Sequence, residues 1–268
     1  LNLRHKKNCL LIGNYIMPSR QEELFNINGK KIIVVGACGG FGLDISNFLH
    51  ECGASLFLVD TNKKKLKLLN DSLPGSICLP LDICNEAHMA TLLESIKKQF
   101  LPLDGAINAA GIFSTEPSID IKIFSFKKFM DINVSGALLF SQVAAKAMGE
   151  TGGRIIHLAS VSSKVTNTKY AAYSSSKAAL SQLVKVLGRE WAEKKILVNA
   201  IGPAMAKNSM SEKFIKDPQF EKQALSSIPI GRFFTSQDLF GVILLLLGNG
   251  GSYITGQTIF VDGGRTLT

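Results

Sequence analysis

Apolar and polar positions alternate along this chain with two periods, one typical of strands and the other of helices. Short runs of mostly apolar residues, many of them β-branched, predict strands at 31–35, 55–59, 77–81, 104–108, 154–159, 196–200 and 258–261. Apolar residues spaced along one helical face predict helices at 41–51, 62–71, 86–99, 125–148, 174–193, 210–226 and 236–247. This alternation predicts an α/β protein, in which a parallel sheet carries helices on both faces. The functional site is expected at the carboxyl ends of the strands.

A glycine-rich loop joins the first predicted strand to the first predicted helix. The strand ends in Val34-Val35 and leads directly into Gly36-Ala37-Cys38-Gly39-Gly40-Phe41-Gly42. Glycines let the backbone approach a ligand closely, and the N-terminus of the helix offers free N–H groups to a pyrophosphate. The next strand ends at Asp60, roughly 20 residues on, where a carboxylate can bind an adenine ribose. The alternative for Asp60 is a simple turn residue at the end of a strand.

Tyr173 and Lys177 share one face of a predicted helix, because positions i and i+4 are neighbours there. A phenol is a poor proton-transfer group at neutral pH, and a nearby ammonium lowers its pKa. The pair therefore predicts a general acid/base, with Ser160 placed upstream to hydrogen-bond the oxygen of a reacting alcohol or carbonyl. Because the Y-x-x-x-K pattern is common by chance, an exposed helix start is the alternative for this pair alone.

Taken in order, these motifs resemble those of the short-chain dehydrogenase/reductase family, in the branch of roughly 250 residues that has an Asn-Ser-Tyr-Lys tetrad. The resemblance runs from about Asn28 to Gly264. The matching motifs are Gly36-x-x-x-Gly40-x-Gly42, Asp60, Asp82, Asn108-Ala109-Ala110-Gly111, Asn133, Ser160, Tyr173-x-x-x-Lys177, Asn199-Ala200-Ile201-Gly202-Pro203, and Thr255-Gly256-Gln257 before Val261-Asp262-Gly263-Gly264.

The resemblance implies a Rossmann-type, doubly wound, parallel seven-stranded sheet that forms one domain over residues 28–268, after an extension over 1–27. It implies hydride transfer between a nicotinamide cofactor and a secondary alcohol or ketone. Tyr173 would exchange the proton, Lys177 would bind the nicotinamide ribose and lower the pKa of Tyr173, and Ser160 would hold the substrate oxygen. Asn133 would hold a water for proton relay, from a kinked helix. The implied cofactor contacts are Gly36, Gly40, Phe41, Gly42, Asp60, Asp82, Ile83, Asn108, Ala109, Gly111, Tyr173, Lys177, Pro203 and Asn208.

Asp60 predicts that NAD(H) is preferred over NADP(H), because a carboxylate pairs with a free 2′-hydroxyl and repels a 2′-phosphate. The basic run Lys63-Lys64-Lys65 weakens this prediction. The chain also departs from the family pattern after the strand that ends near Pro203. Ala204 stands in place of a glycine, and Asn208 stands where a threonine commonly contacts the nicotinamide carboxamide. Val35 replaces a threonine before the first glycine.

The favoured substrate is a small polar secondary alcohol or its ketone, such as a polyol or a sugar acid. Lys164 or Lys207 could pair with a carboxylate, although both could equally be solvated loop lysines. One alternative is an enzyme like the 3-oxoacyl-[acyl-carrier-protein] reductases, which usually prefer NADPH. The other is a non-catalytic nucleotide-binding scaffold, which would not need the whole tetrad. The polar residues expected at the rim are Ser114, Thr115, Ser162, Ser163, Lys164, Lys207 and Asn208.

Composition and charge limit the remaining possibilities. A length of 268 residues with 46% hydrophobic residues fits one domain with a large core. The net charge of +9 is scattered and accompanies no nucleic-acid motif, so no nucleic-acid partner is expected. Five cysteines without C-x-x-C spacing predict reduced thiols in a cytoplasmic protein without a metal site. His157 is interpreted as a residue of the strand that leads to Ser160.

No membrane segment is expected, because the longest later apolar run, Val242–Leu247, is too short to cross a bilayer. Residues 1–16 faintly resemble a signal peptide, but Gly13 and Asn14 interrupt the apolar run, and Met17 is an alternative start. We expect residues 1–16 to be dispensable. The resemblance also implies a homotetramer, in which the two long helices pair between subunits and the C-terminal strand region forms a second interface. The small residues that favour such pairing, or simply core packing, are Ala137, Ala144, Ala147, Ala178 and Ala179.

Overall fold

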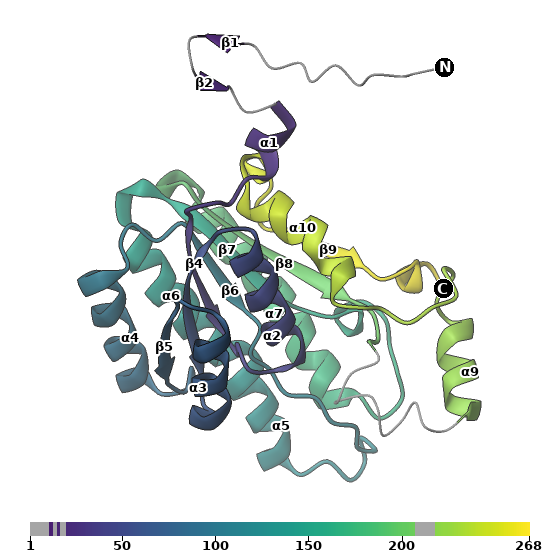
Figure 1. Ribbon diagram of the computed structural model, residues 1–268. Coiled ribbons are helices and arrows are strands. Elements are labelled where there is room, and N and C mark those ends of the chain that lie inside the picture. The colour runs from purple at the N-terminus through teal and green to yellow at the C-terminus, as the bar shows by residue number, and fades with distance from the viewer. Residues whose placement is uncertain (1–10, 13–14, 17–19, 207–217) are drawn as a thin grey trace, which may run out of the picture.

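The computed structural model describes residues 11–12, 15–16, 20–206 and 218–268, and its centre is a parallel sheet of seven strands (Figure 1). The strands follow the order β5-β4-β3-β6-β7-β8-β9. The order runs outward in both directions from β3, as in a doubly wound Rossmann-type sheet, so the predicted fold class is confirmed. The strands are β3 (Lys31–Val35), β4 (Ser55–Asp60), β5 (Ile77–Pro80), β6 (Gly105–Asn108), β7 (Gly153–Leu158), β8 (Ile196–Pro203) and β9 (Thr258–Val261).

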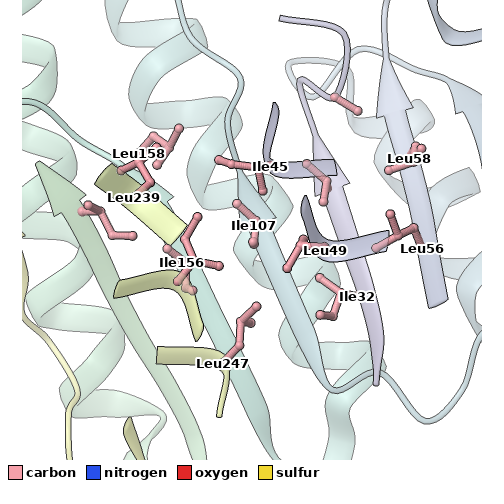
Figure 2. Packing of buried hydrophobic residues seen from close by; sticks show 14 of the residues in the cluster. Ile32, Ile45, Leu49, Leu56, Leu58, Ile107, Ile156, Leu158, Leu239 and Leu247 are labelled. Atoms are coloured by element: carbon pink, nitrogen blue, oxygen red, sulfur yellow. The ribbon is translucent and has the colours of Figure 1, made fainter. Parts of the chain in front are cut away.

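One face of the sheet is covered by three helices, α2 (Gly40–Glu51), α3 (Lys63–Ser72) and α10 (Gln237–Leu247). Figure 2 shows Ile45 and Leu49 of α2 and Leu239 and Leu247 of α10 packed with side chains of the central strands. Alternate strand residues point to this face, as the pleat requires. The strand residues in this cluster include Ile32, Leu56, Leu58, Ile107 and Ile156.

The other face is covered by α4 (Glu86–Gln99), α6 (Gly136–Met148) and α7 (Ala171–Glu190). Ile33, Val35 and Phe57 point to this side, one position along from the residues of the first face. Both faces of the sheet are therefore buried, which explains why its strands read as nearly continuous apolar runs.

The helix predicted over 125–148 is interrupted. It consists of α5 (Ile123–Met130), a π-helical turn (Asp131–Ser135) and α6. The extra residue in a π turn shifts the register of the helix, and such turns are frequent at functional sites. Asn133, where a kinked helix was expected, lies in this π-helical turn.

Three of the five alanines expected at subunit contacts face the sheet instead. Ala137, Ala144 and Ala147 are buried in the core beneath α6, so they cannot touch a second subunit. Ala178 on α7 is exposed. For α6, core packing was thus the correct alternative.

Two shorter segments complete the described chain. The hairpin β1 (Leu11–Ile12) and β2 (Tyr15–Ile16) precedes α1 (Arg20–Phe25), which packs against α10 and residues 249–251. The helix α9 (Pro218–Ser226) covers the C-terminal part of the helix predicted over 210–226. None of the described helices has the length and apolar character needed to cross a membrane.

Candidate active site

The glycine loop after β3 fits closely against the segment that follows β6. Gly36 has a left-handed φ of +73°, and a Cβ there would lie 2.5 Å from the backbone N of Ala110. A Cβ on Gly42 would collide with the carbonyl oxygen of Gly36. Only glycine fits at these two positions, so the loop packs tightly between β3 and α2.

The N-terminus of α2 is left open for an anion. Gly39 precedes the helix, no side chain caps it, and its first turn contains no acidic residue. The free N–H groups and the helix dipole therefore favour a bound phosphate. This cradle fits the pyrophosphate of a dinucleotide, as the sequence predicts for Gly36, Gly40, Phe41 and Gly42.

Asp60 connects the end of β4 to the glycine loop. Its Oδ2 accepts a hydrogen bond from the N–H of Cys38 at 2.9 Å, and its Oδ1 accepts one from the N–H of Asn62 at 2.9 Å. Each oxygen keeps a lone pair that can accept from a ribose hydroxyl. Burial, followed by the Asp60 charge, raises the pKa of the Cys38 thiol to about 12, so this cysteine stays a neutral thiol.

Asp82 and Ile83 follow β5 at the same edge of the sheet. The Oδ1 of Asp82 accepts from the N–H of Cys84 at 2.9 Å. Ile83 is buried against the start of α6, where Gly136 leaves room for its side chain. The two residues thus form a part of the edge where the resemblance implies cofactor contacts.

Asn108, at the end of β6, belongs to a buried chain of hydrogen bonds. Its Oδ1 accepts from the N–H of Ala110 at 3.0 Å, and its Nδ2 donates to Nδ1 of His157 at 3.3 Å. Nε2 of His157 then donates to Ser141 Oγ at 3.0 Å, and that hydroxyl donates to the carbonyl of Ala137 at 2.7 Å. This pattern requires a neutral imidazole, and burial, with the charge of Lys177, lowers the pKa of His157 to about 3.

Asn133, in the π-helical turn, joins the segment after β6 to α7. Its Oδ1 accepts from the N–H of Ile112 at 2.9 Å, and its Nδ2 donates to the carbonyl of Ile112 at 3.2 Å and to Ser176 Oγ at 2.9 Å. Ser176 Oγ donates in turn to the carbonyl of Tyr173 at 2.7 Å. Asn133 thereby holds the backbone of Tyr173 in place.

Ser160 and Tyr173 both line one cavity, and the Ser160 hydroxyl is near enough to lower the pKa of the Tyr173 phenol. Ser160 follows β7, and its Oγ also accepts from the N–H of Ser162 at 3.1 Å. The ring of Tyr173 packs edge-on against Phe113, with 4.9 Å between the centroids. Two side chains from different elements thus place hydroxyl groups in the wall of one cavity, where a substrate oxygen could bind.

Lys177 is buried beside this pair, and its Nζ donates to the carbonyl of Leu158 at 2.7 Å. The Nζ lies 5.8 Å from the ring centroid of Tyr173. Burial lowers the pKa of Lys177 to about 8. We expected Lys177 to lower the pKa of Tyr173, but burial raises that pKa, and the Ser160 hydroxyl offsets part of the rise. Loss of water around the phenol is therefore the main influence on its pKa in the protein without cofactor.

A cavity of about 390 Å³ opens at this point. Arg265, Asn167 and Tyr170 also line it, and no role was predicted for these three residues from the sequence. Arg265 directly follows the predicted motif Val261-Asp262-Gly263-Gly264, which was the signal that could have identified it. The predicted site residues in the cavity wall are Phe41, Ala109, Gly111, Ser160, Tyr173, Lys177 and Pro203.

The rim differs in part from the prediction. Ser162 lines the cavity, whereas Lys164 places its Nζ 5.7 Å from the ring centroid of Phe260 and is not part of the described cavity wall. Lys207 and Asn208 lie outside the described residues. Ala204, which replaces the usual glycine, lines the cavity with its small side chain.

Known proteins resemble this chain over nearly its whole length. The family model described as enoyl-(acyl carrier protein) reductase matches residues 36–266. An NAD-dependent glycerol dehydrogenase of Listeria innocua is 31% identical, over 91% of this chain and 96% of that protein. A 3-oxoacyl-[acyl-carrier-protein] reductase of Rickettsia typhi is 34% identical, over 91% of this chain and 100% of that protein. The solved structure of a short-chain type dehydrogenase/reductase from Mycobacterium marinum has a TM-score of 0.83 and 28% identity, over 91% of this chain and 98% of that one.

Proposed function

This chain belongs to the short-chain dehydrogenase/reductase family and is an oxidoreductase acting on CH–OH groups, and we propose that it uses NAD(H) to interconvert a small polar secondary alcohol and its ketone. A polyol or a sugar acid is the favoured substrate. The observation that carries the proposal is that Ser160, Tyr173 and the buried Lys177 line one cavity.

In this mechanism Ser160 and Tyr173 hold the reacting oxygen from two sides. In ketone reduction, Tyr173 donates its proton to the carbonyl oxygen while Ser160 stabilises the charge that develops there. In alcohol oxidation, Tyr173 must first release its own proton to solvent, and as the phenolate it then accepts the hydroxyl proton. When bound, the nicotinamide supplies or accepts the hydride. The raised pKa of Tyr173 keeps its proton available at neutral pH.

Lys177 and Asn133 organise the reacting groups. Lys177 donates one N–H to the carbonyl of Leu158, and its remaining N–H groups can bind ribose hydroxyls. Asn133 fixes Ile112 in the cavity wall and, through Ser176, the backbone of Tyr173. Asn133 thus holds the proton donor Tyr173 in place, and Lys177 would hold the ribose of a bound cofactor beside it; such positioning is a large part of catalysis in a preorganised site.

The preference for NAD(H) rests on Asp60. Its carboxylate stands at the end of β4 beside the glycine loop, where it can accept from a 2′-hydroxyl and would repel a 2′-phosphate. The glycerol dehydrogenase relative is NAD-dependent by its name. Asp60 also accepts from Cys38 N–H, so its removal would loosen the loop as well as change the preference.

The proposal is tested with a panel of polyols, sugar acids and hydroxy acids, each with NAD⁺ and with NADP⁺. We expect turnover on at least one of these substrates, with a higher kcat/KM for NAD⁺. Tyr173→Phe serves as the control for adventitious activity. A clear preference for NADP⁺ contradicts the role given to Asp60, and activity confined to long-chain acyl thioesters or steroids contradicts the substrate class.

A second candidate is the reduction of 3-oxoacyl thioesters bound to acyl carrier protein. It is favoured by the Rickettsia relative and by the apolar part of the cavity wall, which includes Ile112, Met205 and Ile228. Asp60 argues against it, because such enzymes usually prefer NADPH. A 3-oxoacyl thioester with NADPH, added to the same panel, separates the two candidates.

We further propose that the enzyme works in the cytoplasm as a homotetramer. Cys38, Cys52, Cys78 and Cys84 are free thiols, as expected in a reducing compartment. Exposed apolar side chains on α5 and α7, among them Phe124 and Val186, support contacts between subunits.

A further inference from the structure

The backbone of Arg265 is fixed by the turn that follows β9. Gly263 and Gly264 both have left-handed φ angles, 61° and 88°. The carboxylate of Asp262 accepts from the N–H of Gly264 at 3.0 Å and from that of Thr266 at 2.8 Å. The N–H of Ile230 donates to the carbonyl of Gly263 at 3.1 Å, which ties the turn to the segment before α10. Arg265 therefore enters the cavity wall from a constrained position.

The guanidinium of Arg265 is held by neutral partners. Its Nη2 donates to Asn167 Oδ1 at 3.3 Å, and its Nη1 donates to Thr268 Oγ1 at 3.2 Å. Both bonds are long, and none of the ion pairs found between described residues involves Arg265. A guanidinium carries more N–H donors than these two bonds use, in a planar fork that matches a carboxylate.

The charged side chains in the described part of the cavity wall have one sign. Among the described residues of its wall, Lys177 and Arg265 are charged, both are cations, and no Asp or Glu is present. The two cations come from different elements, Lys177 from α7 and Arg265 from the turn after β9. Aromatic side chains such as Phe113 and Tyr170 form part of the wall and lower the local dielectric constant. Such a cavity concentrates positive potential and favours an anionic ligand.

We propose that Arg265, oriented by Asn167, binds a carboxylate of the substrate, so that the enzyme acts on a hydroxy acid or its oxo acid in preference to a neutral polyol. This inference rests on the proposed function, because Ser160 and Tyr173 must hold the reacting oxygen. The carboxylate then lies at the wall formed by the turn after β9, and the reacting carbon lies at the wall formed by α7. The cavity volume of about 390 Å³ suits a small acid of this kind.

The test compares matched pairs of an acid and its polyol, beginning with D-gluconate and D-glucitol, on Arg265→Gln. We expect kcat/KM for the acid to fall by about 30-fold or more, mainly through KM, because a bidentate charge-assisted contact is lost. The value for the polyol should stay within about twofold. Arg265→Lys should restore part of the affinity for the acid. Lys98→Gln, which neutralises an exposed cation on α4, should change neither value.

A second variant and a binding measurement complete the test. Asn167→Ala leaves the charge of Arg265 but removes the partner that orients it, so KM for the acid alone should rise. Calorimetry measures binding of the acid to the enzyme with NAD⁺ present. The inference is overturned if Arg265→Gln leaves the acid unaffected, if it lowers both substrates equally, or if the wild type neither binds nor oxidises any acid in the panel.

Failure of this inference is distinguishable from failure of the proposed function. If polyols are oxidised, and Tyr173→Phe abolishes that turnover, the proposed function stands while the role of Arg265 is rejected. Turnover of long-chain acyl thioesters alone rejects both.

Discussion

At the scale of single residues, burial governs the chemistry of this site. Loss of water raises the pKa of Tyr173 and lowers that of Lys177 to about 8. Each shift favours the uncharged form, so the free protein holds a protonated phenol beside an ammonium whose charge is costly. Ligands that bring hydroxyl groups or negative charge to Lys177 relieve this cost, which links cofactor and substrate binding to the state of the acid/base pair.

The first prediction concerns Tyr173→Phe. The ring and its contact with Phe113 are kept, but the proton donor is lost, so kcat should fall by about 10³-fold or more. The Kd for NAD(H) should stay within about twofold, because the phenol contributes proton transfer and not most of the binding. Lys177→Ala should weaken both kcat and the Kd for NAD(H). Steady-state kinetics and fluorescence titration measure these quantities, and substantial activity in Tyr173→Phe would contradict the mechanism.

The second prediction concerns acid stability and His157. In the folded protein its pKa is lowered to about 3, whereas in the unfolded chain it takes its ordinary value of 6.5. Below pH 6.5 the unfolded chain binds a proton that the folded protein does not, so stability falls as the pH drops towards 3, by up to about 1.4 kcal/mol per pH unit. Above pH 6.5 the effect is absent.

His157→Gln keeps hydrogen-bonding groups near Asn108 and Ser141 but does not titrate. At pH 7.5 we expect the free energy of unfolding of the variant to be about 1–3 kcal/mol lower than that of the wild type. Between pH 6.5 and 4.5 the free energy of unfolding should decline less steeply for the variant than for the wild type. Urea unfolding of both proteins at several pH values measures the difference. Carboxylates contribute equally to the pH dependence of the free energy of unfolding in the two proteins. Parallel curves for the wild type and the variant would therefore show that His157 does not cause the loss of stability in acid.

The residues of the site differ in how far the sequence could predict them. Tyr173 and Lys177 are neighbours on a helix, so their spacing alone brings them together. The hydrogen bonds from Asn108 through His157 to Ser141 join two strands and a helix, and no local sequence pattern indicates these bonds. No local pattern indicates the contact between Arg265 and Asn167 either, because the two residues are far apart in the sequence. The position of Lys164 over Phe260 also depends on loop packing that hydropathy does not encode.

At the scale of elements, strands and helices could be predicted well where burial dictates the pattern. Residues of the parallel strands are buried on both faces, so β3 and β4 stand out as apolar runs with clear ends. The interruption at 131–135 could not be derived from periodicity, because a single π turn alters the helical spacing by only one residue. The family resemblance supplied that kink.

The third prediction concerns the segments before β3. Leu24 and Phe25 of α1 are partly exposed, whereas Ile27 is 2% exposed and belongs to the core on the α2 side. Deleting residues 1–16 should leave kcat and Tm nearly unchanged. Deleting residues 1–27 removes Ile27 and the packing of α1 on α10, so the free energy of unfolding should drop by about 2–5 kcal/mol. Calorimetry measures the stability of both deletion variants. An equal loss of stability in the two variants would mean that residues 1–16 stabilise the protein.

At the scale of the whole molecule, the sheet collects groups that are distant in sequence. The register pairs Val35 with Asn108, and Asn108 with His157, across three central strands. The glycine loop, Asp60, Asn108 and Ser160 each follow a strand, so they meet at one edge. The same burial that builds this edge also places Ala137, Ala144 and Ala147 inside the core, and it leaves apolar side chains such as Phe124 of α5 and Val186 of α7 exposed.

The last prediction concerns the oligomeric state. Two isologous interfaces, one of them at α5 and α7, would generate a tetramer of about 116 kDa, four times 29.0 kDa. Val186 is an apolar residue of α7 that is 43% exposed, so Val186→Glu would place a charge in that interface and leave the core untouched. Burying an unpaired carboxylate there costs several kcal/mol, enough to release dimers of about half the tetramer mass at micromolar concentration. Leu68→Glu is the matched control, because Leu68 is an exposed apolar residue of α3, on the opposite face of the sheet. Light scattering should find tetramers for the wild type and for this control, and a wild type that stays monomeric at micromolar concentration excludes the tetramer.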